Sequence, residues 1–449
     1  MIDSSFRTPM HSSAYVQIFF FLLLCVTVGH AFNSGDSRAK LRAASIPRNV
    51  GAGLADLLHS FHHMRHEPSS ASLHPIMRQH LEEEFVSVDI LLDGSSTIAQ
   101  VKDELRAVGT HVTHEAPTFR HGFLQAEMPL SGTRDASAVP GVLSILLSQS
   151  SEHALAERLV PRLRDRLITY DDIDLSQAIG PMQLWNLIGL SQGEGVTVGV
   201  ISDTFNFLKG YLRDIQGGFL PGQGNPRGHS ERVVVVTESA NGFDEGRAML
   251  QLVHSIAPKA RLCFGAGMKG PAQFADSLRA LTAPSGKCGA DIVIDDVSSF
   301  ENPYEDGIGA QAIDEAALSM NVLHFAAVGN RRAFVRECEV EMIPAHDSDV
   351  PIELKRFYFM THWARFPSEL SNFRGEPVYN GFGFRLKTGF NNPQLRTYWN
   401  QATGLVYDDL DLYVFDTSGV RPVASSVDDN FATGSATEVI TVFAGGPYV

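Results

Sequence analysis

Hydrophobic and polar residues follow a regular pattern between residues 85 and 148. Apolar positions within 98–108 recur at the spacing of one helix face, and the runs around them alternate as strands do. Thr97 can cap the start of this helix, and Gly109 can end it. The pattern therefore predicts a β-α-β-β-α-β unit with strands at 85–92, 111–115, 122–128 and 142–147 and helices at 98–108 and 134–139.

From residue 193 onward the pattern changes to nearly continuous apolar runs separated by helix-like segments. Such runs are typical of parallel strands that are buried on both faces of a sheet. Short helical crossovers between them imply right-handed β-α-β units, so we expect an α/β fold with a doubly wound parallel sheet. The predicted strands are 195–206, which ends in a polar tip, 232–237, 261–265, 290–296 and 322–330.

The segment 241–260 is predicted to be a loop that leads into an amphipathic helix ending at Pro258. Its apolar face is expected to contain Ala248, Leu252, Val253 and Ile256. Glu245 lies at the start of this helix, where backbone N–H groups lack intrahelical partners and the helix dipole is positive. A carboxylate in that position is well placed for chemistry.

Acidic residues follow two of the predicted parallel strands. Asp203 comes at the end of the first strand, and Asp295 and Asp296 end the fourth. Residues at the carboxyl ends of parallel strands face the ligand crevice of an open α/β sheet. Asp203 is therefore a candidate site residue. The other two acids could bind substrate or a cation, although capping and loop hydrogen bonds explain them about as well.

Two of these strands resemble those of subtilisin-like serine peptidases. Val200-Ile-Ser-Asp-Thr204 resembles the strand of the catalytic Asp, and Ala326-Ala-Val-Gly-Asn330 resembles the strand that ends in the oxyanion-hole Asn. The combined resemblance covers roughly residues 85–335. It implies a subtilisin-like parallel sheet, preceded by a ferredoxin-like α+β propeptide unit, and a serine endopeptidase acting on peptides or proteins. It requires no cofactor.

The resemblance assigns Glu245 an unusual role. Ala257-Pro258 follows Glu245-Gly246 at the distance that separates the corresponding Ala-Pro from the catalytic His helix start in subtilisins. Glu245 therefore stands in the place of that His, as in the sedolisins, which are acid-acting relatives with a Ser-Glu-Asp triad. The second sedolisin acid lies four residues along the helix, where this chain has Met249, so the partner would be Asp203 or Asp244.

A site with Glu as the general base is expected to work best at acidic pH. A histidine base works near neutrality because its ordinary pKa is about 6.5, whereas a free Glu titrates near about 4.3. An alternative role for Glu245 is that of an N-terminal helix acid without catalysis. Arg247 is expected to pair with Glu245 or Asp244 unless it is a solvated charge. His254 and His324 are expected to be core histidines.

The nucleophile of the family is missing from the printed sequence. Subtilases carry it in Gly-Thr-Ser, and no Gly-Thr-Ser is present. Ser435 is rejected because a β pattern follows it. The nucleophile is therefore unknown, and the chain is expected to stop short of the serine-bearing helix. A pseudopeptidase that binds peptide without catalysis is the alternative; a small-molecule-binding α/β protein is a weaker third possibility.

The segment 351–449 is rich in alternating, strand-like runs and is predicted to be a β-sandwich insert or appended domain. Asp408, Asp409 and Asp411 could hold a structural calcium ion, although a solvated strand face is the favoured alternative. A histidine cluster lies in the leader at His59, His62, His63 and His66; a solvated helix face is favoured over a metal site there.

The N-terminal apolar run at 18–28, followed by small residues, predicts a cleaved secretory signal, with an uncleaved anchor as the alternative. Export permits a disulfide, but spacing does not select a pair among Cys263, Cys288 and Cys338. The net charge of −15 argues against nucleic acid or an anionic membrane surface as partner. The predicted divisions are signal 1–31, disordered leader 32–84, propeptide-like unit 85–150, connector 151–190, peptidase domain 191–350 and β-sandwich segment 351–449.

Overall fold

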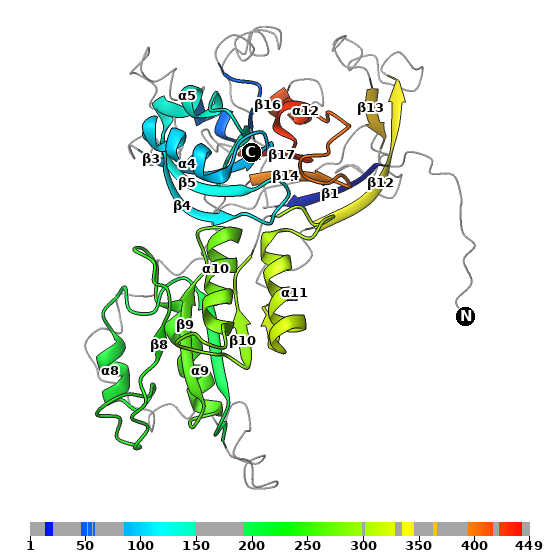
Figure 1. Cartoon of the computed structure of the whole chain (residues 1–449). Coiled ribbons are helices and arrows are strands. Elements are labelled where there is room, and N and C mark those ends of the chain that lie inside the picture. Colours follow the sequence, from blue (N-terminus) through cyan, green and yellow to red (C-terminus); the bar gives the residue numbers. More distant parts are fainter. Residues whose placement is uncertain are drawn as a thin grey trace, which may run out of the picture.

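The computed structural model describes the chain in several stretches that together contain four sheets (Figure 1). Asn330, the connector 151–190 and the leader histidines fall outside them. The described residues are 14–20, 46–51, 53–55, 57–58, 85–148, 192–298, 301–327, 335–344, 362–365, 394–415 and 422–441.

The first described unit has the predicted β-α-β-β-α-β order of elements. Its strands and helices are β3 (Phe85–Leu92), α4 (Ile98–Ala107), β4 (His111–Ala116), β5 (Phe123–Pro129), α5 (Thr133–Ser137) and β6 (Val142–Leu147), with a 3₁₀ turn, η1 (Leu130–Gly132), before α5. β6, β3, β5 and β4 pair in this order, and every pair is antiparallel. The helix α4 begins as predicted at Thr97, which forms a capping box with Gln100.

A short strand from the leader extends this sheet. β2 (Val50–Gly51) pairs in parallel with β6, and Ile46, Val50 and Leu54 are buried in the core of the unit. The prediction of a disordered leader over 32–84 is therefore wrong for residues 46–51. Local composition did not reveal this strand, because its stability comes from pairing with a strand almost a hundred residues further along the chain.

The second unit contains a fully parallel five-stranded sheet, as predicted. Its strands are β7 (Thr197–Ser202), β8 (Val234–Val235), β9 (Arg261–Ala266), β10 (Ile292–Asp295) and β11 (Leu323–Ala326), paired in the order β11-β10-β7-β9-β8. The helices are α8 (Tyr211–Gln216), α9 (Glu245–Ile256), α10 (Pro271–Thr282) and α11 (Ile308–Met320).

Helices cover both faces of the parallel sheet. Alternate residues of β9 separate the two cores: Cys263 packs with α10 and α11, whereas Phe264 packs with Leu250 of α9 and Ile215 of α8. This burial of both faces explains the continuous apolar runs of β7 and β9, whereas Leu323 and Phe325 of the edge strand β11 are 59% and 57% exposed. The fold is therefore of the α/β class.

The face that α9 buries differs from the predicted one. Gly246, Leu250 and His254 are buried, whereas Leu252 is 43% exposed and Ala248 is exposed. The helix is rotated because Gly246 lets its first turn approach the ring of Phe264. A count of apolar residues could not detect a contact that depends on the absence of a side chain.

The two units meet through α10. The antiparallel sheet lies against α10 (Figure 1). Leu91 and Phe123 of this sheet, with Phe119 of the loop between β4 and β5, belong to the core that contains α10. At the edge of this contact the imidazole Nδ1 of His114 lies 2.7 Å from a carboxylate oxygen of Asp276. Gln125 adds a hydrogen bond from its side-chain amide to the carbonyl oxygen of Lys269 at 2.6 Å.

The remaining described strands are antiparallel. The five-stranded sheet has the order β13-β12-β1-β14-β17, and β15 pairs with β16. β12 belongs to this sheet although it falls within the predicted domain 191–350, and β1 falls within the predicted signal 1–31. The elements are β1 (Ala14–Phe20), β12 (Val335–Pro344), β13 (His362–Arg365), β14 (Gln394–Trp399), β15 (Leu412–Phe415), β16 (Pro422–Ser426), α12 (Asn430–Thr433) and β17 (Thr437–Thr441).

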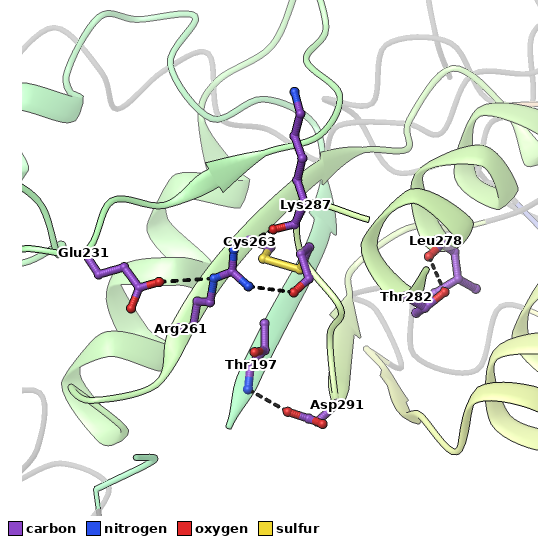
Figure 2. The surroundings of a disulfide bond; sticks show 9 residues. Thr197, Glu231, Arg261, Cys263, Leu278, Thr282, Lys287 and Asp291 are labelled. Atoms are coloured by element: carbon purple, nitrogen blue, oxygen red, sulfur yellow. Dashed lines mark hydrogen bonds and ion pairs between the residues drawn. A yellow bond between two sulfur atoms is a disulfide. The ribbon is translucent and has the colours of Figure 1, made fainter. Parts of the chain in front are cut away.

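A disulfide joins Cys263 of β9 to Cys288, which lies in the loop before β10 (Figure 2). Arg261 strengthens the same connection by donating hydrogen bonds to the carbonyl oxygens of Lys287 and Cys288. The side chain of Cys338 lies outside the described residues. Within the described stretches, no helix has both the length and the apolar character needed to cross a bilayer.

Candidate active site at the carboxyl edge of the parallel sheet

The chain changes direction across the parallel sheet at β7. From β7 it runs to β8 and β9 on one side, and then passes to β10 and β11 on the other. Ligands of open α/β sheets bind at such a switch point, in the crevice outside the carboxyl ends of the strands. The side chains that follow β7 and β10 therefore define the candidate site.

Asp203 follows β7 directly and is only 1% exposed. One of its carboxylate oxygens accepts a hydrogen bond from the backbone N–H of Phe243 at 2.5 Å, and the other accepts one from Gly246 at 3.2 Å. These bonds occupy N–H groups at the start of α9, which have no intrahelical partners. Asp203 therefore fixes the position of the first turn of α9 relative to the sheet.

Two glycines allow this close approach. A Cβ atom on Gly242 would lie 2.8 Å from a carboxylate oxygen of Asp203, and one on Gly246 would lie 2.2 Å from the ring of Phe264. Either side chain would push α9 away from the end of β7. Close packing against Phe264 therefore explains the glycine at position 246, whether or not Glu245 is catalytic.

Asp244 lies at the N-cap of α9 with a left-handed backbone, φ 60°. Its buried carboxylate accepts hydrogen bonds from the Thr204 hydroxyl at 2.9 Å and from the backbone N–H groups of Phe207 and Leu208 at 2.7 and 3.0 Å. Arg247 forms an ion pair with the same carboxylate. These partners make Asp244 the anchor of the loop after β7, whereas Asp203 contacts the helix itself.

Arg247 pairs with Asp244, one of the two partners predicted for it. Its Nε also donates to Asp214 of α8 at 2.7 Å, and another guanidinium nitrogen donates to the carbonyl oxygen of Phe205 at 2.8 Å. Burial raises the pKa of Asp214, and the neighbouring Arg247 opposes that rise. The guanidinium thus connects α8, α9 and the loop after β7.

Glu245 is the first residue of α9 and is exposed. Its carboxylate forms no hydrogen bond or ion pair with another residue of the described stretches. The start of the helix that carries it is nevertheless fixed, because the backbone N–H of Gly246 donates to Asp203 and that of Asp244 donates to the Thr204 hydroxyl. Glu245 therefore combines a fixed backbone with a carboxylate that is accessible from the crevice.

Asp296 is the third carboxylate at this edge. Asp295 pairs in register with Ile201, so Asp296 lies beside Ser202, the residue before Asp203. The pKa of Asp296 is raised to about 6, mainly by burial and to a smaller extent by the negative charges of Glu245 and Asp203, while a hydrogen bond with Ser202 opposes the rise. One oxygen of Asp296 is buried and has no hydrogen-bond partner among the described residues. The cluster therefore tends to hold a proton.

The neighbouring Asp295 has structural contacts instead. It accepts a hydrogen bond from the backbone N–H of Val297 at 2.9 Å, and Nε2 of His324 lies 2.9 Å from its other oxygen. His324 also packs edge-on against Phe274. His254 is 2% exposed, and burial lowers its pKa to about 4. Both histidines belong to the core, as predicted.

One acidic residue near the site was missed by sequence reasoning. Glu238 follows the predicted strand 232–237, so the rule that selected Asp203 could have selected it. Its carboxylate accepts backbone hydrogen bonds from Phe205 at 3.0 Å and Asn206 at 3.1 Å. Glu238 and Asp244 therefore hold the loop after β7 from two sides.

The C-terminal candidates lie apart from this edge. Ser435 is buried between α12 and β17, so it does not begin a helix. Asp408 binds the amide of Gln401, and Asp409 accepts from the backbone N–H of Asn430 at 2.9 Å. Within the described part of the chain, no group of three or more His, Cys, Asp or Glu side chains is arranged to hold a metal ion.

Comparison with known proteins assigns no family to the chain. No family model matches it, and no curated protein matches it. The fold and the site define an α/β protein with three carboxylates at the carboxyl edge of a parallel sheet. Any more specific function has to be argued from this geometry.

Proposed function

We propose that this chain carries the acid–base part of the active site of a secreted serine-type endopeptidase, formed as a precursor and similar to subtilisins and sedolisins. The observation that carries the proposal is the meeting of Asp203, Glu245 and Asp296 at the switch point of the sheet. Paired carboxylates in such a crevice are typical of acid–base chemistry. The subtilisin-like form of the sheet is part of the same proposal.

In this proposal Glu245 is the general base. It takes the proton from a serine hydroxyl as the oxygen attacks the peptide carbonyl, and it returns that proton to the leaving amine. Asp203 orients the helix turn that carries Glu245. Asn330, which lies outside the described residues, would donate to the developing oxyanion, and the serine itself remains to be identified.

Asp296 supports an acidic working range for this site. With a pKa of about 6 it keeps its proton at a pH where an ordinary Glu is ionised. The cluster can then contain one ionised base without three negative charges in one crevice. Above that range the additional charge of Asp296 disfavours the arrangement.

The unit at 85–148 fits the role of a propeptide. Its sheet packs on α10, and its contact with the parallel domain includes the pair of His114 with Asp276. The disulfide between Cys263 and Cys288 is consistent with export, because such bonds persist in oxidising compartments. Secretion and removal of the signal 1–31 belong to this proposal.

A second candidate is a pseudopeptidase that binds peptides in the same crevice. The observation that favours it is the absence of Gly-Thr-Ser from the 449 printed residues. Both candidates require the crevice to bind peptide, and only the first requires a reactive serine.

A fluorophosphonate probe separates the two candidates. The native protein, purified from its natural source, is treated with the probe and analysed by mass spectrometry. Labelling of one serine, reduced at least tenfold by Glu245→Gln, supports the peptidase. The matched control is Glu194→Gln, an exposed acid at the opposite end of β7. Absence of label, together with retained peptide binding, contradicts the peptidase and supports the pseudopeptidase.

A further inference from the structure

A row of polar residues crosses the sheet face that packs on α10. Asp89 of β3, Gln125 of β5 and His114 of β4 are direct cross-strand neighbours in the register of the antiparallel sheet. Leu91, two residues after Asp89 and therefore on the same face, belongs to the core that contains α10. The row thus lies within the contact between the antiparallel unit and the parallel domain.

Two members of the row reach the parallel domain directly. The side-chain amide of Gln125 donates to the carbonyl oxygen of Lys269 at 2.6 Å, and the imidazole Nδ1 of His114 lies 2.7 Å from Asp276. The approach is close, because a Cβ atom on Gly270 would lie 2.6 Å from the amide nitrogen of Gln125. The start of α10 is therefore packed tightly against the middle of the row.

Two buried oxygens in this row lack a hydrogen-bond donor. Asp89 is partly exposed as a residue, but its Oδ1 is buried, as is Oε1 of Gln125, and neither atom has a hydrogen-bond partner among the described residues. Directly opposite side chains of this kind lie about 4.5–5.5 Å apart at Cβ. An ionised Asp89 and the Gln125 carbonyl are both acceptors, so neither satisfies the other. A proton on Asp89 supplies a donor at this place.

The charged groups around Asp89 come from outside the antiparallel sheet. They are Glu301, which precedes α11, and Arg396 of β14. The pKa of Asp89 is raised to about 7, mainly by burial and to a smaller extent by Glu301, while a hydrogen bond with Ser148 and the charge of Arg396 oppose the rise. Separation from the parallel domain would remove Glu301 and admit water, so it would favour the ionised carboxyl.

The histidine of the row responds to protons in the same direction. His114 and Asp276 form an ion pair only when the imidazole carries a proton, so acid strengthens this part of the contact. Two ion pairs of a lysine or arginine with a carboxylate also cross the contact: Lys269 with Glu127 at 3.9 Å, and Arg120 with Glu305. Asp89 and His114 are therefore the two groups of the row through which a proton stabilises the contact.

We propose that protonation of Asp89 controls the contact between the antiparallel unit and the parallel domain, so that the contact is tight in acid and loosens toward neutrality. The stabilisation is complete below the ordinary Asp value of 3.8 and is lost as the pH rises through the pKa of about 7 in the packed state. Between these values each pH unit weakens the contact by up to about tenfold. The inference goes beyond the proposed function and holds whether or not the chain is a peptidase.

A buried thiol can report the opening of this contact in the full chain. Ala272 of α10 is 2% exposed and lies one helical turn before Asp276, on the face that meets β4. The reaction of the Ala272→Cys variant with a dipyridyl disulfide is followed from pH 5 to pH 7.5 by mass spectrometry of the labelled peptide. The rate for the same thiol in urea, divided by this rate, gives its protection, which should fall at least about twentyfold over the range.

Replacement of Asp89 should remove most of this fall. Asp89→Asn keeps the shape of the side chain and supplies an amide donor at every pH, so protection should fall less than about fivefold, the remainder coming from His114. Asp89→Thr, which suits a strand and supplies a hydroxyl donor, gives the same test if the amide variant does not fold. Asp103→Asn, which removes an exposed carboxyl of α4, should leave the fall unchanged.

A second thiol separates opening of the contact from unfolding of the unit. Ala126→Cys lies in the core of the antiparallel unit, away from α10, and its protection should change much less with pH than that of Ala272→Cys. Constant protection at Ala272→Cys, an equal fall at both thiols, or a fall that survives both Asp89 variants would overturn the proposal. None of these results bears on the proposed function, because the assay needs neither the carboxylate cluster nor a nucleophile.

Discussion

Three carboxylates at one sheet edge have three different environments. Asp203 is buried and accepts a backbone hydrogen bond from the first turn of α9, whereas Glu245 is exposed on that helix. Asp296 has one buried oxygen without a hydrogen-bond partner among the described residues. The three carboxylates therefore differ in exposure and in hydrogen bonding, although they lie at the same edge of the sheet. Asp203 and Glu245 were found from the sequence by their places in a strand and a helix. The behaviour of Asp296 depends on burial, which the sequence pattern does not contain.

Asp296→Asn tests the electrostatics of the cluster. The folded-state pKa of about 6 lies above the ordinary value of 3.8 for Asp, so the folded protein binds this proton more tightly than the unfolded chain. The resulting stabilisation is complete below about pH 3.8 and is lost as the pH rises through about 6. Replacing the acid should therefore raise the free energy of unfolding by about 2 kcal/mol at pH 7 and by less than about 1 kcal/mol at pH 4.

Urea unfolding of this variant at both pH values is the measurement. Asp103→Asn, which removes an exposed carboxyl of α4, is the matched control and should show little dependence on pH. If Asp296→Asn raises the free energy of unfolding equally at pH 4 and pH 7, or more at pH 4, the fold does not raise the pKa of the Asp296 carboxyl.

At the scale of elements, local sequence patterns predicted where the strands lie better than they predicted which strands pair. The strands β7 and β9 were evident from their continuous apolar runs, because they are buried on both faces. The pairing of β2 with β6, and of β12 with β1, joins segments far apart in the sequence, and no local pattern encodes it. The buried face of α9 was also mispredicted, since a glycine contact determines its rotation.

The junction of α8, α9 and the loop after β7 depends on Arg247. Arg247→Met should lower the free energy of unfolding by about 3 kcal/mol, because it leaves the buried Asp244 carboxylate without its cation. Lys102→Met, which breaks the exposed pair with Glu115, should cost less than about 1 kcal/mol. Urea unfolding at pH 7 compares the two variants, and equal losses would show that the junction has no special importance.

At the scale of the whole molecule, a disulfide crosslinks the parallel domain internally, whereas the contact between this domain and the antiparallel unit is noncovalent. The disulfide joins β9 to the loop before β10 (Figure 2), whereas the packing of β4 and β5 on α10 relies on apolar contact and a few polar bonds (Figure 1). Predicted export permits a disulfide, but the positions of the four cysteines in the sequence do not show which two are bonded.

The double substitution Cys263→Ser and Cys288→Ser should lower the free energy of unfolding by about 3 kcal/mol, because the bridge restricts a loop of 25 residues in the unfolded chain. Thermal unfolding with and without reductant provides the check. Reductant should destabilise the parent protein and leave the double variant unchanged. Peptide mapping that finds Cys338 bonded to either cysteine would contradict the assignment.

The most direct test of the central claim is the pH dependence of serine labelling in the native protein. The rate of fluorophosphonate reaction is measured from pH 3 to pH 9 for the parent and for Glu245→Gln. A carboxylate base predicts a rate that reaches its full value below neutrality, and the ionisation of Asp296 predicts a decline as the pH rises past about 6. Glu245→Gln should lower the rate by at least about tenfold. A maximum well above neutrality, or a rate that is unchanged in Glu245→Gln, would contradict the assignment of Glu245 as the base.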